Sequence, residues 1–163
     1  MVPSPTFGFF LEDIFWAGLA TLGFAVLFNV PRRLLPACVL CGAAGHVVRQ
    51  LLVVMFGASL EVATFAGAIV VGLLGEVFAR RWHAPAIIFQ VAAAIPLVPG
   101  AFAYRGMLAL IRLPGAETES VSPFAEAGIF FIRTGLILAA IGGGIAIPNL
   151  LRQRRKPTRD SIH

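Results

Sequence analysis

Charged side chains are scarce in this chain of 163 residues, because Asp, Glu, Lys and Arg together make up only 13% of it. Soluble domains average about 25% charged residues. In contrast, 58% of this sequence is hydrophobic, with a mean hydropathy of +0.88. The low charge excludes an ordinary soluble domain. It indicates an integral membrane protein with one helical domain, residues 1–151, followed by a basic cytoplasmic tail, residues 152–163.

The sequence also lacks the motifs of several functional classes. It contains no P-loop, HExxH, paired-Asp or GxSxG pattern, which argues against an ATPase and against an enzyme. Cysteine is equally scarce, since Cys38 and Cys41 form a single CxxC within an apolar segment. Such a pair has neither the further ligands of a zinc site nor the βαβ context of a redox motif. We therefore expect buried cysteines, no metal and no cofactor.

The net charge of +5 comes largely from basic residues that flank the apolar segments. The positive-inside rule places such short basic flanks in the cytoplasm, so their position argues against a nucleic-acid partner. Five spans that begin outside would put nine of the 13 basic residues inside, with the N-terminus outside and the C-terminus cytoplasmic. These nine are Arg32, Arg33, Arg80, Arg81, Arg152, Arg154, Arg155, Lys156 and Arg159.

Apolar segments long enough to cross a bilayer predict an all-α integral membrane fold with five transmembrane helices. The first segment is expected to be a retained span, because no Lys or Arg precedes it to form the n-region of a signal peptide. The outer loop near 113–126 carries Glu117 and Glu119. The five segments cover residues 7–30, 34–56, 60–79, 85–111 and 127–151.

The fourth segment is interrupted near its centre by Pro96, Pro99 and Gly100. Proline lacks an N–H and clashes with the carbonyl four residues earlier, so the helix is expected to break there. In lipid, freed backbone groups are tolerated only where protein buries them or where they line a polar cavity. A half-helix beginning after Gly100 would favour an anion at its N-terminus. A re-entrant hairpin would export the basic tail, so we interpret the segment as one crossing with an unwound middle. A substrate site and a simple packing kink both remain open.

The second segment carries two polar residues on one helix face, His46 and Arg49, beside the small residues Gly42 and Gly45. An arginine within a span needs a counter-charge, a cavity or a ligand. Its guanidinium suits bidentate binding of a carboxylate, and His46 could titrate near physiological pH. The structural alternative is that Arg49 extends to the interface and His46 bonds a backbone carbonyl.

Further polar residues receive local interpretations. Tyr104 and Gln90 flank the break and are expected near its cavity. The acidic residues are expected to act close to where they stand: Asp13 as an interfacial anchor, and Glu61 as a complement to the start of its helix. The third segment has small or polar residues at every fourth position, which predicts close packing first and a site second. That stripe is Thr64, Ala68, Gly72 and Glu76, and Glu76 is expected to pair with Arg80.

Several uncommon runs together resemble a known family. In their order and spacing they are similar to the threonine/serine exporter (ThrE-like) family, in its short YjjB-like form, over residues 12–112. The runs are Gly23-Phe24-Ala25 with Phe28-Asn29-Val30-Pro31, Gly42-x-x-Gly45-His46-x-x-Arg49, Ala63-Thr64-Phe65 and Ile95-Pro96-x-x-Pro99-Gly100-x-x-Ala103-Tyr104.

The resemblance implies a bacterial inner-membrane subunit of a secondary transporter that exports small carboxylate metabolites. Members of the family are associated with threonine and serine, and with dicarboxylates such as succinate. The resemblance implies a larger YjjP-like membrane subunit as partner. The odd number of spans also points to a second half, because many transporters consist of inverted repeats. Whether two copies of this chain pair instead stays open.

Two alternatives to transport remain at this point. One is an assembly subunit without substrate contact, and the other is a membrane enzyme that acts on lipid phosphate. For the transporter, the expected driving force is an ion or proton gradient. Its predicted substrate-binding residues are Arg49, His46, Pro96, Pro99, Gly100, Tyr104 and Thr64.

Overall fold

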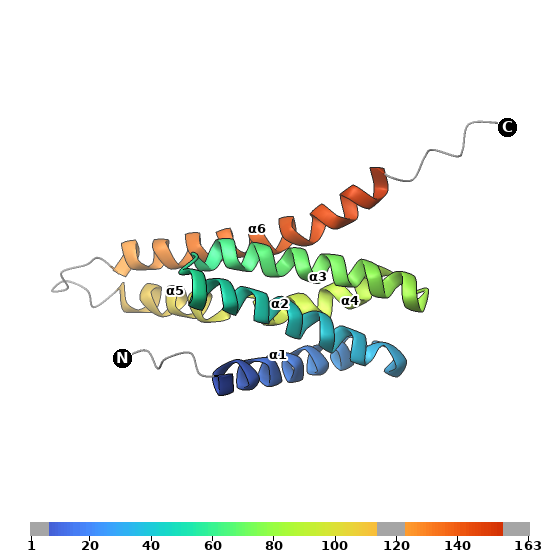
Figure 1. Cartoon of the computed structure of the whole chain (residues 1–163). Helices are drawn as coiled ribbons and strands as arrows, with labels where there is room; N and C mark the ends of the chain where they lie inside the picture. Colours follow the sequence, from blue (N-terminus) through green and yellow to red (C-terminus); the bar gives the residue numbers. More distant parts are fainter. Residues whose placement is uncertain (1–6, 114–122, 155–163) are drawn as a thin grey trace.

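The chain folds into a bundle of long helices (Figure 1). The computed structural model describes residues 7–113 and 123–154, and within these ranges it contains helices and no strand, as predicted. Glu117, Glu119 and most of the basic tail lie outside the described residues. The helices are α1 (Phe7–Leu27), α2 (Leu35–Phe56), α3 (Leu60–Trp82), α4 (Ala86–Ala94), α5 (Gly100–Arg112) and α6 (Pro123–Arg154), with short 3-10 helices η1 (Arg32–Leu34) and η2 (Ile95–Leu97).

Four of these helices, α1, α2, α3 and α6, are long and apolar enough to cross a membrane. A fifth span results if α4 with η2 and α5 is counted as one interrupted helix. The lengths of the apolar segments predicted where the spans lie, but they predicted less accurately where each helix ends. α1 stops at Leu27, because Asn29 adopts a left-handed φ of 57° and Pro31 follows. α3 continues through Arg80 and Arg81 to Trp82, since a helix does not stop where its apolar stretch ends.

The two halves of the interrupted helix lie end to end along the bundle (Figure 1). They are bent by 50° at the break, so both halves run in broadly the same direction. A hairpin would instead return the chain to the side from which it came. The predicted interruption at Pro96–Gly100 is therefore present, and its geometry agrees with a single path through the bundle.

Small residues allow α3 to pack closely against the helices on either side of it. A Cβ placed on Gly67 would lie 2.5 Å from the carbonyl oxygen of Gly45 on α2. A Cβ placed on Gly144 of α6 would lie 2.6 Å from Cβ of Ala68. Real Cβ atoms do not approach this closely, so no larger residue fits at either position. Close packing of both predicted small-residue faces is confirmed.

Both cysteines are free and buried, as expected. Cys38 and Cys41 belong to the apolar core together with Phe89, whose ring lies near those of Phe78 and Trp82. The aromatic group holds α4 against the end of α3. The core thus fixes the first half of the interrupted helix and includes Leu97 at the break, which is fully buried.

A buried amide pair joins α4 to α6. Gln90 is only 1% exposed, and its Nε2 donates to the Gly72 carbonyl at 3.1 Å and to Oδ1 of Asn149 at 3.2 Å. Asn149 Nδ2 donates in return to Oε1 of Gln90 at 3.4 Å. The expectation that Gln90 faces the break was wrong. Gln90 packs instead over Gly75, where a side chain would leave no room for it.

We expect Asn149→Ala to lower the free energy of unfolding by about 1–3 kcal/mol, because the Gln90 amide would lose its partner while staying buried. The double variant Gln90→Leu/Asn149→Leu removes both partners together. Its loss of unfolding free energy should therefore be smaller than the sum of the losses in Gln90→Leu and in Asn149→Leu. Chemical unfolding of the detergent-solubilised chain measures both. Strictly additive effects would show that the two amides do not interact.

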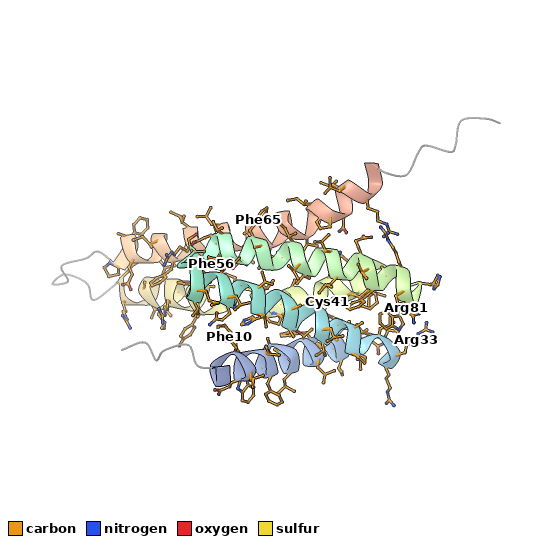
Figure 2. The ribbon with its side chains drawn as sticks, viewed as in Figure 1. Phe10, Arg33, Cys41, Phe56, Phe65 and Arg81 are labelled. Atoms are coloured by element: carbon orange, nitrogen blue, oxygen red, sulfur yellow. The ribbon has the colours of Figure 1, made fainter. Side chains whose placement is uncertain are left out.

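Basic residues gather at one end of the bundle. Figure 2 shows Arg33 and Arg81 at the same end, and Arg80 and Arg152 line one cavity nearby. Phe56 and Phe10 mark the opposite end (Figure 2). The helices therefore bring the predicted basic flanks together, as one membrane surface would require.

Candidate functional site: a cavity at the broken helix

A cavity of about 200 Å³ lies at the break between η2 and α5. Residues of α2, α3, η2, α5 and α6 form it. Among the described residues, Arg49 is the one charged residue in its wall; the remaining wall consists of apolar side chains and of the backbone at the break. The lining residues are Arg49, Leu60, Pro96, Leu97, Val98, Pro99, Gly100, Ala101, Phe102 and Ile137.

The backbone at the break has fewer internal hydrogen bonds than a helix. Val98 is extended, with φ −64° and ψ 131°, so the helical ladder stops there. The Gly100 N–H donates to the carbonyl of Val98 at 2.9 Å, and the Phe102 N–H to that of Pro99 at 3.1 Å. Ala101, between them, donates to no carbonyl in the described chain. The first turn of α5 therefore presents a free N–H at the cavity wall.

Arg49 replaces one of the backbone hydrogen bonds that the break removes from the helix. Its Nη1 donates to the Leu97 carbonyl at 3.3 Å, a carbonyl that a continuous helix would bond internally. Its Nη2 contacts Nε2 of His46. Its Nε is buried and has no hydrogen-bond partner among the described residues. An unpaired buried donor is costly, and this N–H reaches an acceptor only if the side chains around it move.

Behind Arg49, His46 bonds an acidic residue of α1. Nδ1 of His46 lies 2.8 Å from Oδ2 of Asp13, and the two side chains are only 13% and 21% exposed. The interpretation of Asp13 as an interfacial anchor was therefore wrong. Asp13, His46 and Arg49 form one continuous polar chain that ends at the carbonyl of Leu97.

The sequence did contain a signal for Asp13. Counting in fours from it reaches Ala17, Thr21 and Ala25, all of which are buried. Residues at that spacing share a helix face. Asp13 thus begins the face of α1 that packs on α2, where Thr21 lies against Gly42. An acidic residue on a packing face needs a partner, and the polar face of α2 supplies it.

The other predicted site residues are divided by their position. Pro96, Pro99 and Gly100 line the cavity with Arg49. His46 touches Arg49 from behind and is outside the lining. Thr64 is buried one turn from the cavity residue Leu60, to whose carbonyl its hydroxyl donates at 2.6 Å. Tyr104 is 64% exposed and also lies outside the lining.

Arg133 has a partner beside the same cavity. Its Nε lies 3.4 Å from Oε1 of Glu61, in the first turn of α3, and its guanidinium carbon lies 5.6 Å from the centre of the Phe102 ring. Such a position over an aromatic face is favourable for a cation. Glu61 therefore does more than complement its own helix. This contact ties α3, α5 and α6 together next to the wall formed by Phe102.

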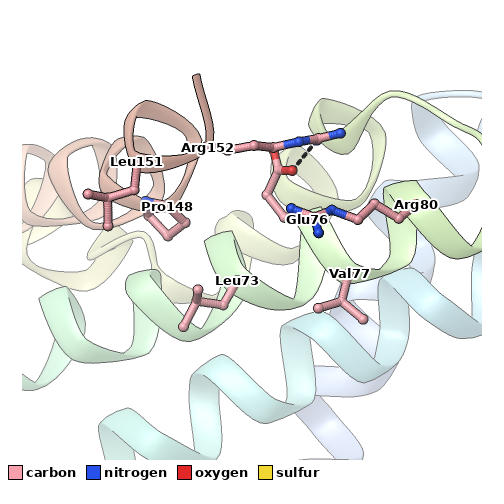
Figure 3. Close-up of a pocket in the computed structure, with 7 residues that line it drawn as sticks. All are labelled: Leu73, Glu76, Val77, Arg80, Pro148, Leu151 and Arg152. Carbon is pink, nitrogen blue, oxygen red and sulfur yellow. Dashed lines mark hydrogen bonds and ion pairs between the residues drawn. The ribbon is translucent and has the colours of Figure 1, made fainter. Parts of the chain in front are cut away.

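A second cavity, of about 320 Å³, lies between α3 and α6 at the basic end of the bundle (Figure 3). Within it Arg152 forms an ion pair with Glu76 (Figure 3). The predicted partner, Arg80, lines the same cavity but does not hold that bond. The error has a clear cause, since Gly72 and Gly144 let α6 approach α3 closely enough to bring Arg152 to Glu76. Among the described residues, no group of three or more His, Cys, Asp or Glu is placed to hold a metal ion.

We expect Pro96→Ala/Pro99→Ala to close the cavity, because both changes restore N–H groups and make a continuous helix from 86 to 112 more favourable by about 3 kcal/mol each. An Ala101→Cys reporter in a chain without Cys38 and Cys41 would measure this through its labelling rate with a thiol reagent. Labelling should fall in the double proline variant. It should not change in Pro36→Ala, since that proline is in the first turn of α2. Equal labelling in all three chains would contradict the link between the prolines and the cavity.

The fold and site together define a class, a multi-pass helical membrane protein with a cavity at an interrupted helix that one arginine lines. The family can then be stated directly. The family model described as "Threonine/Serine exporter, ThrE" matches residues 13–151, and the chain belongs to that family. An uncharacterised protein of Haemophilus influenzae is 38% identical over 147 residues, which cover 90% of this chain and 49% of that protein. The chain thus spans about half the length of this relative. No solved structure matches this chain.

Proposed function

We propose that this chain is a membrane subunit of a secondary transporter that exports small carboxylate metabolites across a bacterial inner membrane. Threonine, serine and dicarboxylates such as succinate are the candidate substrates. The observation that carries the proposal is the position of Arg49, whose side chain lines the cavity and donates to the Leu97 carbonyl at the break. Membership of an exporter family supports it.

The cavity has the chemistry of a carboxylate site. The guanidinium of Arg49 supplies a positive charge, and the α5 N-terminus, where the N–H of Ala101 donates to no carbonyl of the described chain, adds a favourable dipole. Leu60, Phe102 and Ile137 supply apolar walls for the rest of the molecule. Pockets for drug-sized ligands measure roughly 300–1,000 Å³. A cavity of about 200 Å³ suits a metabolite of a few carbon atoms instead.

The direction of the chain in the membrane belongs to the same proposal. Arg33, Arg81 and Arg152 mark one end of the bundle, and the positive-inside rule makes that end cytoplasmic. The N-terminus is then outside, and the interrupted helix is the fourth of five spans. Helices that are broken near the middle of the membrane are frequent substrate sites in transporters, because their free backbone groups contact the ligand.

A second membrane subunit completes the transporter in this proposal. A larger YjjP-like protein is the partner implied by the family resemblance. The Haemophilus influenzae relative is about twice as long as the segment it shares with this chain. Its length supports a transporter that consists of two parts, of which this chain is one. A pair of two copies of this chain is the other arrangement, and co-purification distinguishes the two.

The test is export by the purified complex. Proteoliposomes containing both subunits, loaded with labelled threonine, serine or succinate, should release at least one of these faster than liposomes containing the partner alone. A complex that assembles fully but releases none of the three would reject the transporter and favour an assembly subunit. Loss of one subunit in cells should likewise reduce efflux of the same metabolite.

A further inference from the structure

We propose that the second cavity, between α3 and α6 at the basic end of the bundle, binds an anionic phospholipid. The lipid phosphate contacts the arginines of the cavity, and an acyl chain lies along its apolar side chains. The inference goes beyond the proposed function and does not depend on it, because this cavity shares no lining residue with the cavity at the broken helix. The observations that carry it are the direction of α3 and α6, the order of residues along the cavity, and one arginine without a partner.

The helices α3 and α6 run side by side toward the same end of the bundle. A Cβ placed on Gly72 of α3 would lie 3.0 Å from Cγ of Pro148 on α6. Four residues further along each helix, Glu76 of α3 forms its ion pair with Arg152 of α6. An equal step along both helices leads from one contact to the next, so the two helices are parallel. The residues that follow on each helix therefore approach the same membrane surface.

The cavity lies where α6 turns away from α3. Pro148 is inside α6, and a proline bends a helix because it lacks an N–H and its ring clashes with the carbonyl four residues earlier. The last turns of α6 lean away from α3 in Figure 1. The space between the helices measures about 320 Å³. It is open to the side, because Leu73, Val77 and Leu151 in its wall are 51%, 57% and 60% exposed.

The residues along the cavity follow the order of groups in a phospholipid. On α3, Val77 and Leu73 lie one and two turns before Arg80, a spacing that keeps all three on one helix face. Figure 3 shows Arg80 and Arg152 toward one end of the cavity and Leu73 and Leu151 toward the other. The arginines belong to the basic flanks of the spans, which lie at a membrane surface. An acyl chain at the leucines thus brings its phosphate to the arginines.

The charges in the cavity suit a ligand with a single negative charge. Glu76 is bonded to Arg152, so these two charges cancel. Arg80 makes no hydrogen bond or ion pair with any described residue, which leaves one uncompensated positive charge in the wall. Arg152 uses Nη1 for Glu76 and retains other N–H donors for a phosphate oxygen. A phosphodiester supplies one negative charge and the acceptors that both guanidinium groups need.

The same contacts select against zwitterionic lipids. The ammonium of phosphatidylethanolamine needs an acceptor of its own. Glu76 is the one carboxylate among the described residues that line the cavity, and it is bonded to Arg152 and only 13% exposed. A lipid with net negative charge, such as phosphatidylglycerol, requires no such acceptor. Basic pockets between transmembrane helices bind anionic headgroups in other membrane proteins.

The experiment is native mass spectrometry of the purified chain in neutral detergent. The chain is titrated with phosphatidylglycerol, phosphatidylethanolamine or phosphatidylcholine, all with the same acyl chains. Wild type should bind phosphatidylglycerol about 5-fold or more tightly than either zwitterionic lipid, because this lipid brings a net charge to Arg80. Arg80→Gln should remove that preference, and it should fold, since Arg80 is exposed and unpaired among the described residues. The matched control is Arg81→Gln, which removes an exposed cation next to Arg80 but outside the cavity and should bind as wild type.

A second variant tests the apolar part of the cavity. Leu73→Trp places a larger side chain at a half-exposed position of the wall and leaves every charge in place. It should weaken phosphatidylglycerol binding by filling the space for the acyl chain. Glycerol 3-phosphate and inorganic phosphate carry the same acceptors without a chain, and neither should displace the lipid.

The outcomes decide between a lipid site, a soluble anion and a basic surface. Equal binding of all three lipids by wild type would overturn the inference. Equal loss of preference in Arg80→Gln and Arg81→Gln would also overturn it, since any cation at this end would then serve. Displacement by either soluble phosphate, or unchanged lipid binding by Leu73→Trp, would reject the lipid in favour of a soluble phosphate.

Discussion

Replacing Gly67 with leucine is expected to prevent the bundle from assembling. A Cβ on Gly67 would already lie 2.5 Å from the Gly45 carbonyl oxygen and 3.5 Å from Cβ of Arg49. The first contact is with backbone, which cannot turn aside as a flexible side chain can. Since α3 lies between α2 and α6, separating α2 from α3 opens the centre of the bundle. It also displaces Arg49 from the cavity.

Gly67→Ala gives the graded form of this result. One added methyl group should cost about 1–3 kcal/mol or more of unfolding free energy, the usual range for overpacking. The matched control is Gly142→Ala on α6, where an added Cβ would have nothing within 4 Å. That change should be neutral or stabilising by up to about 1 kcal/mol, because alanine favours helix over glycine. Thermal unfolding of the purified chain in detergent measures both, and equal Tm values would contradict the close contact between α2 and α3.

Features that depend on local chemistry were predictable from the sequence. Long apolar segments located the spans, because lipid imposes a length and a composition on any helix that crosses it. The break at Pro96–Gly100 was equally predictable, since two prolines and a glycine within five positions disrupt a helix, whereas the single Pro148 lies inside α6 without ending it. The sequence also indicated that Arg49 needs a counter-charge, a cavity or a ligand within its span, although it did not place Arg49 at the break.

Features that depend on how helices face one another were harder to predict. Asp13 and His46 are 33 positions apart, and their hydrogen bond exists only because α1 packs on that face of α2. The spacing rule for helices favoured Arg80 as the partner of Glu76, whereas the contact between α3 and α6 supplied Arg152. A local pattern places Asp13 on a packing face, but it does not say which residue of another helix lies opposite.

Tyr104 shows the limit of reasoning from proximity along the chain. It is in the second turn of α5, close to the break in sequence, and yet it is exposed. Successive helix residues are separated by about 100°, so Tyr104 points roughly 200° away from Phe102. Phe102 forms the cavity wall, and the opposite face of α5 therefore carries Tyr104 away from it.

Arg49→Ala is expected to reduce carboxylate export by about 10- to 100-fold. A hydrogen bond to a charged group contributes about 1.5–3 kcal/mol, and the variant removes at least one such bond to the carboxylate. A loss of that size corresponds to about one to two factors of ten in rate. Arg49→Lys should also fail to restore export, because one ammonium cannot reach His46, the Leu97 carbonyl and a substrate as a planar guanidinium does.

The control for Arg49 is Arg112→Ala, which removes an exposed cation in the last turn of α5. Export by both variants is measured in proteoliposomes after confirming that each still co-purifies with the partner subunit. Arg112→Ala should export as wild type does. If Arg49→Ala assembles and exports equally well, the carboxylate is bound elsewhere. Arg49 would then serve only to bond the Leu97 carbonyl, and the interrupted helix would be a packing feature.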